Sequence, residues 1–149
     1  MSYTKLTYHG VWSTKGRIAA LYDDMRDRLH AYIAEIINEE FGFAREVGGV
    51  DHHVHVLCDI RPVFNMSDVM GQLKSKSSGW IHREFPNLKD MSWQSGYGAF
   101  TVSASRVPDV AKYVRNQEKH HKSRGFEEEF IALLEKHGME YDERYVFCE

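Results

Sequence analysis

The sequence predicts an α+β fold in which helices cover one face of a four-stranded antiparallel sheet. Four short segments are rich in the β-branched and aromatic residues that favour strands. The segments between and after them have apolar residues at three- and four-residue spacing, which is typical of amphipathic helices. The chain has 149 residues, of which 42% are hydrophobic, so it is long enough to bury a core around such a sheet.

The first strand is predicted over residues 1–12, and Ser13-Thr14-Lys15-Gly16 breaks it. A helix is predicted over residues 18–40, because its apolar residues recur at helical spacing while acids and bases fill the other face. Gly42 follows and suits a left-handed cap at the C-terminal end of this helix.

Residues 43–50 and 53–60 are predicted to form a hairpin whose turn falls between Gly48 and His52. Side chains alternate between the two faces of a strand, so the second strand presents two sets of residues. The set that we expect to pack against helices is Val54, Val56 and Cys58. The set that we expect on an open face is His53, His55, Leu57 and Asp59.

A second long helix is predicted to begin near Asn65 or Ser67, since either side chain can cap it, and to end at Pro86. Residues 92–103 are predicted to form the fourth strand. Two glycines lie inside this strand, which is typical of a bulge or of close approach by another backbone.

The C-terminal part is predicted to be helical. One helix opens at Pro108, near its first turn, and runs to about Lys122. Another runs from Phe126 to a closing Gly138, and the tail at 139–149 carries aromatic residues that could dock on the body. The order of elements matches the split βαβ, ferredoxin-like plan, with an antiparallel sheet, helices on one face and additional C-terminal helices. We expect residues 1–149 to form one domain, because no repeat or linker interrupts them.

Composition excludes several classes of protein. No apolar run approaches the roughly 20 residues that span a bilayer, and the N-terminus lacks the apolar stretch of a secretory signal, so a cytoplasmic protein is expected. The two cysteines, Cys58 and Cys148, do not form the pattern of a disulfide framework or a zinc site.

The net charge of −3 gives no overall basic excess for binding nucleic acid, but the charge is unevenly distributed. Residues 103–124 carry six bases against two acids, or +4, whereas residues 125–149 carry two bases against eight acids, or −6. The basic segment could face phosphates, or it could be a solvated helix face.

His53 and His55 lie two residues apart on a predicted strand, so both imidazoles point from one face and could reach the same metal ion. Tyr113 and Gln117 lie four apart in a predicted helix and also share a face. Imidazoles and an amide oxygen can hold a divalent ion beside a phenol that acts as a nucleophile. The combination indicates phosphodiester chemistry on a nucleic acid, although the histidines could be surface residues and the tyrosine a packing residue.

Other polar residues have more than one interpretation. Asp51 could orient an imidazole or could be a turn residue. His120 and His121 could meet phosphate, support the site or be solvated. A cationic and hydroxyl cluster in the second long helix could contact phosphate oxygens or form an ordinary exposed face. The members of this cluster are Lys74, Lys76, Ser77 and Ser78.

Five blocks in order along the chain resemble the single-tyrosine HUH transposases of the IS200-like insertion-sequence family, of the transposase-A type. HUH denotes His, a hydrophobic residue and His, and here it is His53-Val54-His55. The family usually has Asp directly before the first His, whereas this chain has His52 there, preceded by Asp51. The three-residue pattern alone is weak, but the ordered blocks are highly specific and cover nearly the whole chain. The other blocks are Tyr8 to Lys15, Trp93 to Phe100, Tyr113 to Gln117 with His120-His121, and Asp142 to Tyr145.

The resemblance implies a metal-dependent transposase that cleaves and rejoins single-stranded DNA at the ends of an insertion sequence. Tyr113 would be the catalytic nucleophile and would become joined to the 5′ end of the DNA, leaving a free 3′ hydroxyl that can later reseal a different junction. His53, His55 and Gln117 would hold Mg²⁺ or Mn²⁺, and two imidazoles favour Mn²⁺ because Mg²⁺ prefers oxygen ligands. The residues that we expect to bind DNA are Lys74, Lys76, Ser77, Ser78, Lys112 and Arg115.

The resemblance also implies partners. We expect a homodimer that recognises a hairpin near each end of the element and that can complete one subunit's histidine site with the other's tyrosine. No nucleotide cofactor is expected, because the covalent phosphotyrosine bond stores the energy needed for rejoining.

Competing hypotheses start from the same residues. A non-catalytic ferredoxin-like module could stack nucleic-acid bases on aromatic side chains, for which Tyr97 and Phe100 are candidates. A relative that nicks repeats without moving itself lies between this module and a transposase. A nicking enzyme of the replication-initiator or relaxase kind would share the histidines and the tyrosine, but the small size of the chain argues against it.

Overall fold

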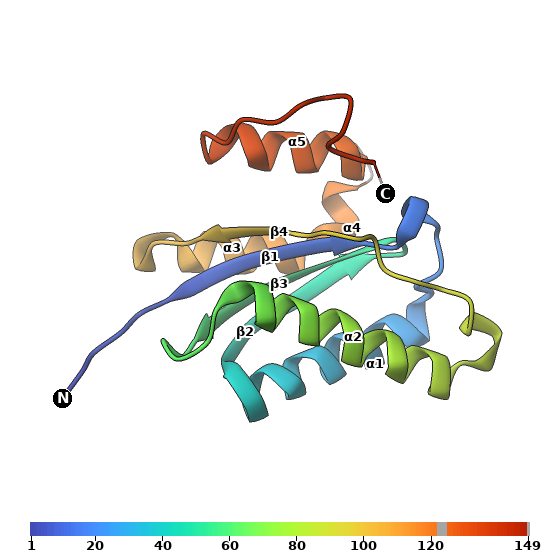
Figure 1. Ribbon diagram of the computed structural model, residues 1–149, viewed down its shortest axis with the longest axis horizontal. Helices are drawn as coiled ribbons and strands as arrows, with labels where there is room; N and C mark the ends of the chain where they lie inside the picture. Colours follow the sequence, from blue (N-terminus) through green and yellow to red (C-terminus); the bar gives the residue numbers. More distant parts are fainter. Residues whose placement is uncertain (122–124, 149) are drawn as a thin grey trace.

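The computed structural model describes residues 1–121 and 125–148. Within these residues, four strands form one antiparallel sheet in the order β2-β3-β1-β4. The strands are β1 Thr7–Ser13, β2 Gly42–Val50, β3 His53–Ile60 and β4 Gly98–Thr101. This strand order confirms the predicted α+β fold with its split βαβ plan. Figure 1 shows the sheet between two layers of helices.

One helical layer consists of α1 Asp23–Ile36, which continues into the π-helical turn Ile37–Phe41, and α2 Met66–Glu84. These helices pack on the face of β3 that carries Val54 and Val56, as predicted. Asn65 caps α2, because its side chain accepts a hydrogen bond from the backbone N–H of Asp68. The shorter helical turns of the chain are η1 Lys15–Arg17, η3 Pro86–Leu88 and η4 Ala104–Arg106.

The predicted start of the first helix, at residue 18, was wrong by five residues, because α1 begins at Asp23. The backbone N–H of Leu21 instead donates to the carbonyl of Asp51, in the turn between β2 and β3. Leu21 is also fully buried in the core. The segment before α1 is therefore fixed by the hairpin turn and by packing rather than by helical hydrogen bonds.

The second helical layer consists of α3 Val107–Arg115, α4 Gln117–His120 and α5 Phe126–Lys136. It covers the sheet face that we expected to be open, so that expectation was wrong: His53, His55 and Leu57 are each 0% exposed. The physical reason is the apolar side of α3, where Val107 and Val114 pack on Leu57. The histidine pair thus faces a buried interface between the sheet and the C-terminal helices.

Two predicted elements in the second half of the chain are also shorter in the structure. The helix predicted from Pro108 to Lys122 is divided at Asn116, whose φ of −99° and ψ of 28° leave the helical region. Its predicted end at Lys122 lies outside the described residues, as do Arg124 and Glu149. The strand predicted over 92–103 is reduced to β4, with a separate bridge between Trp93 and Thr14.

The tail after α5 packs on the body, which confirms that expectation. Its partly buried Tyr141, Val146 and Phe147 join a cluster formed by β1, β4 and α5. Phe147 also contacts Phe130 of α5, with ring centroids 6.0 Å apart. Among the described residues, no helix has both the length and the apolar character needed to cross a membrane.

Close packing of α3 on β2 depends on Gly48. A Cβ atom at this position would overlap the carbonyl oxygen of Val114 in α3. We therefore expect Gly48→Ala to lower the free energy of unfolding by about 1–3 kcal/mol, measured by urea denaturation. Gly71→Ala is the matched control, because a Cβ atom there meets no atom within 4 Å and alanine should stabilise α2 by about 1 kcal/mol. Equal stability of Gly48→Ala and the wild type would contradict this packing.

Candidate metal centre and nucleophile

Four possible metal-binding atoms converge between β3 and the C-terminal helices. The Nε2 atom of His53 lies 3.0 Å from Oε1 of Gln117 and 3.4 Å from Oε1 of Glu129. The Nε2 atom of His55 lies 2.9 Å from the same Glu129 oxygen. All four residues are buried, with at most 1% of their surface exposed. The two histidines therefore meet Gln117, as predicted from sequence, and also a carboxylate that was not predicted.

Tyr113 lies next to these four donor atoms. Its hydroxyl donates a short hydrogen bond to Oε2 of Glu129, the carboxylate oxygen on the other side from the two histidines. His121 also lies 3.2 Å from Oε2, through its Nε2 atom. The ring of His120 packs on Tyr113 with centroids 4.6 Å apart. Of the interpretations left open for His120 and His121, the geometry therefore favours support of the site.

Each histidine of the pair is held by another imidazole. Nδ1 of His55 lies 2.7 Å from Nε2 of His9 on β1, and Nδ1 of His53 lies 2.9 Å from Nδ1 of His52. Such contacts fix the plane of each ring and leave its Nε2 atom directed at Glu129. Asp51 is a turn residue whose carboxylate lies 3.7 Å from Nε2 of His52.

Burial keeps the imidazoles of His53 and His9 neutral at neutral pH. Burial lowers the pKa of His53 to about 4, although its hydrogen bond to Glu129 opposes this shift. Burial and the neighbouring His55 lower the pKa of His9 to about 3. For Glu129, burial alone would raise the pKa, but hydrogen bonds from His121, His53 and His55 lower it well below its usual range. At neutral pH the Glu129 carboxylate is therefore ionised and the His53 imidazole is neutral, which are the protonation states that bind metal ions.

The donor set suits a divalent cation. Neighbouring ligands around an ion with bond lengths of about 2.1 Å lie about 3 Å apart, close to the spacings between the donor atoms of this site. Two imidazoles, one amide oxygen and one carboxylate oxygen form a mixed nitrogen and oxygen set of the kind that suits Mn²⁺ or another transition metal better than Mg²⁺. The group formed by His53, His55 and Glu129 is thus a candidate metal centre.

Glu129 is the functional residue that sequence reasoning missed. A signal was present, because Glu129 lies three residues after Phe126 and four before Leu133, within the apolar stripe of α5. A carboxylate in a buried stripe needs partners, and here the histidines provide them. Its distance from His55 in the sequence, 74 residues, is why pattern and spacing did not connect the two.

The predicted DNA-binding residues are divided between two sides of the molecule. Lys112 and Arg115 are exposed on α3, next to Tyr113, and Arg115 pairs with Glu46 at 2.9 Å. The cluster on α2 lies in the other helical layer, across the sheet from Tyr113. The two groups are therefore not brought together around the tyrosine.

Within the α2 cluster, most of the polar groups bind the protein itself. The ammonium of Lys74 donates to the carbonyls of Gln94 and Gly96, and that of Lys76 pairs with Glu40. Ser78, half-buried on α2, donates to the carbonyl of Ser75. The expectation that Ser77 meets phosphate is corrected, because Ser77 is fully buried. Its hydroxyl accepts a hydrogen bond from the indole N–H of Trp93.

Only one of the two aromatic residues proposed to stack on nucleic-acid bases is accessible. Phe100 is 3% exposed and packs between β1 and α5, so a nucleic-acid base could not stack on its ring. Tyr97 is 38% exposed and remains accessible.

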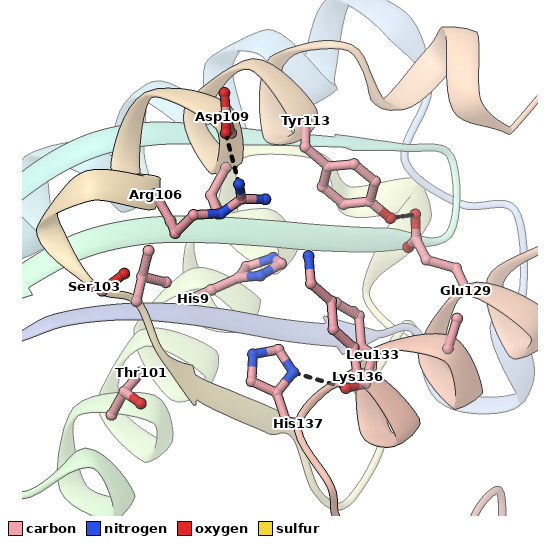
Figure 2. A pocket seen from close by; sticks show the side chains of 13 residues that line it. His9, Thr101, Ser103, Arg106, Asp109, Tyr113, Glu129, Leu133, Lys136 and His137 are labelled. Carbon is pink, nitrogen blue, oxygen red and sulfur yellow. Dashed lines mark hydrogen bonds and ion pairs between the residues drawn. The ribbon is translucent and has the colours of Figure 1, made fainter.

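A pocket of about 440 Å³ opens beside Tyr113. Its walls come from β1, from the segment after β4, from α3 and from α5, and it is bordered by both Tyr113 and Glu129. Figure 2 shows the phenol of Tyr113 directed at the carboxylate of Glu129 at one end of this space, with His9 below them. The tyrosine is therefore reachable from solvent, although the histidine pair behind it is buried.

Comparisons with known proteins converge on one group. A family model described as IS200-like transposase matches residues 2–117. The transposase for insertion sequence element IS200 of Salmonella typhimurium strain LT2 is 28% identical over 119 residues, which cover 75% of this chain and 78% of that protein. The Salmonella typhi transposase for the same element gives equal values.

Two solved structures of similar fold are also described as transposases. A Deinococcus radiodurans R1 protein described as a transposase superposes with a TM-score of 0.65 at 27% identity, over 78% of this chain and 93% of that one. A REP-associated tyrosine transposase, solved bound to a REP hairpin, superposes with a TM-score of 0.56 at 14% identity, over 76% of this chain and 67% of that one.

The metal-free protein should lose stability in acid, partly through His9. Its folded pKa of about 3 lies below the ordinary 6.5, so the unfolded chain takes up this proton first. Stability should be retained above about pH 6.5 and fall toward pH 3, by up to about 1.4 kcal/mol per pH unit for this one group. His9→Gln keeps a side chain that can bind His55 but cannot titrate. Urea unfolding between pH 7 and pH 4 should therefore show a shallower fall for the variant, and identical slopes would contradict the assignment.

Proposed function

Because this chain belongs to the IS200-like transposase family, we propose that it cleaves and rejoins single-stranded DNA with Tyr113 as the nucleophile. The observation that carries the proposal is the position of Glu129. One oxygen of its carboxylate faces His53 and His55, and the other accepts the hydrogen bond of the Tyr113 hydroxyl. The nucleophilic oxygen and the candidate metal centre are thus neighbours within one chain.

We propose His53, His55, Gln117 and Glu129 as the residues that hold a divalent ion, Mn²⁺ or Mg²⁺. When bound, such an ion would polarise the scissile phosphate and neutralise the negative charge that develops on it. The contacts from His9 and His52 keep the two ring planes fixed, so the donor atoms are arranged before the ion arrives. Gln117 is fixed in the same way, since its amide N–H lies 3.4 Å from the carbonyl oxygen of Tyr113.

The proposed reaction forms one bond and breaks another. The phenolic oxygen of Tyr113 gives up its proton and joins the phosphorus atom, while the bond from phosphorus to the 3′ oxygen breaks. The departing 3′ oxygen takes up a proton and becomes a free hydroxyl, and the 5′ phosphate stays on the tyrosine. Attack of a 3′ hydroxyl on this phosphotyrosine reverses the chemistry and joins DNA strands. Glu129 is a positioning residue for the nucleophile, because its hydrogen bond directs the phenol.

We further propose that the DNA substrate carries a hairpin and that the protein works as a homodimer. A hairpin-bound transposase of similar fold supports the first part. For the second part, the tyrosine and the donor atoms of this structure come from the same chain, so an active site assembled within one subunit is available. Exchange of tyrosines between subunits would place the same groups together across a dimer.

The nucleophile can be tested directly. We expect the wild-type protein to form a covalent adduct with single-stranded DNA from the regions flanking its gene in the presence of Mn²⁺, detected as a shifted band on a denaturing gel. Tyr113→Phe should abolish the adduct, because the variant lacks the attacking oxygen, while DNA binding is retained. Tyr3→Phe is the matched control, since Tyr3 is 88% exposed and distant in sequence from the site. An undiminished adduct in Tyr113→Phe would show that another residue is the nucleophile.

The metal centre can be tested without DNA. Removing the charge of Glu129 with Glu129→Gln should weaken Mn²⁺ binding about tenfold or more, measured by isothermal titration calorimetry. Glu127→Gln provides the control, because Glu127 lies on the same helix with 57% of its side chain exposed and pairs with Arg17. Equal Mn²⁺ affinity of Glu129→Gln and the wild type would remove Glu129 from the ligand set.

A further inference from the structure

We propose that the pocket beside Tyr113 binds one nucleotide of the DNA strand next to the scissile phosphate, and that Lys136 contacts a phosphate of that strand. This inference rests on the proposed function and assigns a substrate subsite to it. It concerns α5, which lies beyond the residues that the family model matches, 2–117. The C-terminal part of the chain thus contributes Lys136 and Glu129 to a pocket whose other walls lie within the matched residues.

The position of the pocket fits this role. Tyr113 and Glu129 border it, whereas His53 and His55 behind them are fully buried. A phosphate that reaches the phenolic oxygen through this pocket has the candidate metal centre on its far side. The volume of about 440 Å³ lies in the range of pockets that enclose small ligands, so it is large enough for one nucleotide.

Lys136 supplies the positive charge inside the pocket. Figure 2 shows its side chain extending from α5 into the space, with the ammonium directed toward His9 and Tyr113. Its charge acts on His9, where it contributes to the lowered pKa of that imidazole. Among the residues that the structure describes, no hydrogen bond or ion pair satisfies the Lys136 ammonium. An uncommitted ammonium next to a nucleophile is suited to a phosphate oxygen.

The other charged groups of the pocket are already paired. Arg106 lies at the pocket wall with its guanidinium 3.2 Å from the carboxylate of Asp109. Glu129 is committed to the histidines and to Tyr113. Lys136 is therefore the cation of this pocket best able to accept a new anionic partner without breaking an existing pair.

An aromatic surface lies next to Lys136. The ring of His137 stacks on Phe100 with centroids 4.4 Å apart and an interplanar angle of 22°. Its Nδ1–H donates to the carbonyl of Leu133, which holds the ring in place. His137 is exposed, so a nucleotide base could pack on the imidazole while its phosphate meets Lys136.

The test measures binding apart from cleavage. The Tyr113→Phe protein is titrated into a fluorescent 12-nucleotide single-stranded DNA of mixed sequence in EDTA, and the dissociation constant is followed by anisotropy from 50 to 200 mM salt. Adding Lys136→Ala should weaken binding about fivefold at the lowest salt and make the slope of log affinity against log salt shallower by about 0.7, the value for one lost phosphate contact on a single strand. Lys136→Arg should restore both quantities.

Lys89→Ala is the matched control, because Lys89 lies in the loop after η3 and outside the pocket, and it should leave affinity and salt slope unchanged. Unchanged affinity and slope in Lys136→Ala would overturn the subsite while leaving the proposed function intact. Absence of any binding by the Tyr113→Phe protein would contradict both the subsite and the proposed function. Urea unfolding of each variant confirms that the compared proteins are equally folded.

Discussion

The arrangement of the site depends on one buried carboxylate, that of Glu129. A carboxylate with 1% exposure is costly to bury unless it is hydrogen-bonded, and three imidazoles and a phenol satisfy it here. These partners come from the central strand β3, from the tyrosine helix α3 and from the segment after α4. Glu129 therefore joins the sheet to the C-terminal helices and places the two chemically active parts of the site, imidazole nitrogen and phenolic oxygen, on opposite sides of one group.

His9 and His52 contact the histidine pair through their imidazoles. These contacts would let each histidine of the pair keep its hydrogen bonds both without a metal ion and with one. In the metal-free protein, Nε2–H of His55 can donate to Glu129 while Nδ1 accepts from His9. A metal ion bound at Nε2 would require this proton to be on Nδ1, which would then donate to His9. An imidazole partner can take either part in this hydrogen bond, whereas an ionised carboxylate can only accept. The hydrogen bond between His53 and His52 can likewise run in either direction. His52 stands where the family usually has Asp, and it can therefore still support His53 as a proposed metal ligand.

Much of the fold agrees with the sequence prediction, and the structure brings His53 and Gln117 together as expected. The alternation of side chains along β3 correctly separated Val54 and Val56 from the histidines. Tyr113 and Gln117 were predicted to share a face of one helix, but that helix is divided at Asn116 and the two residues lie in α3 and α4. The prediction that the histidine face of β3 is open was wrong. The alternation of side chains shows which residues share a face of a strand, but it does not show which elements cover that face. The cover is α3 and α5, and their position is set by tertiary packing such as Val114 on Leu57. Glu129 was missed for the same reason, since its partners lie far away in the sequence.

We propose that a divalent ion bound by the histidine pair lies next to the Tyr113 oxygen. Anomalous diffraction from crystals grown with Mn²⁺ tests it most directly, because the scattering locates the ion independently of the protein density. We expect one manganese peak in contact with Nε2 of His53, Nε2 of His55 and the Glu129 carboxylate, with the Tyr113 hydroxyl beside it. A manganese peak that avoids both histidines, or a bound ion from which the tyrosine oxygen is separated by packed side chains, would contradict it.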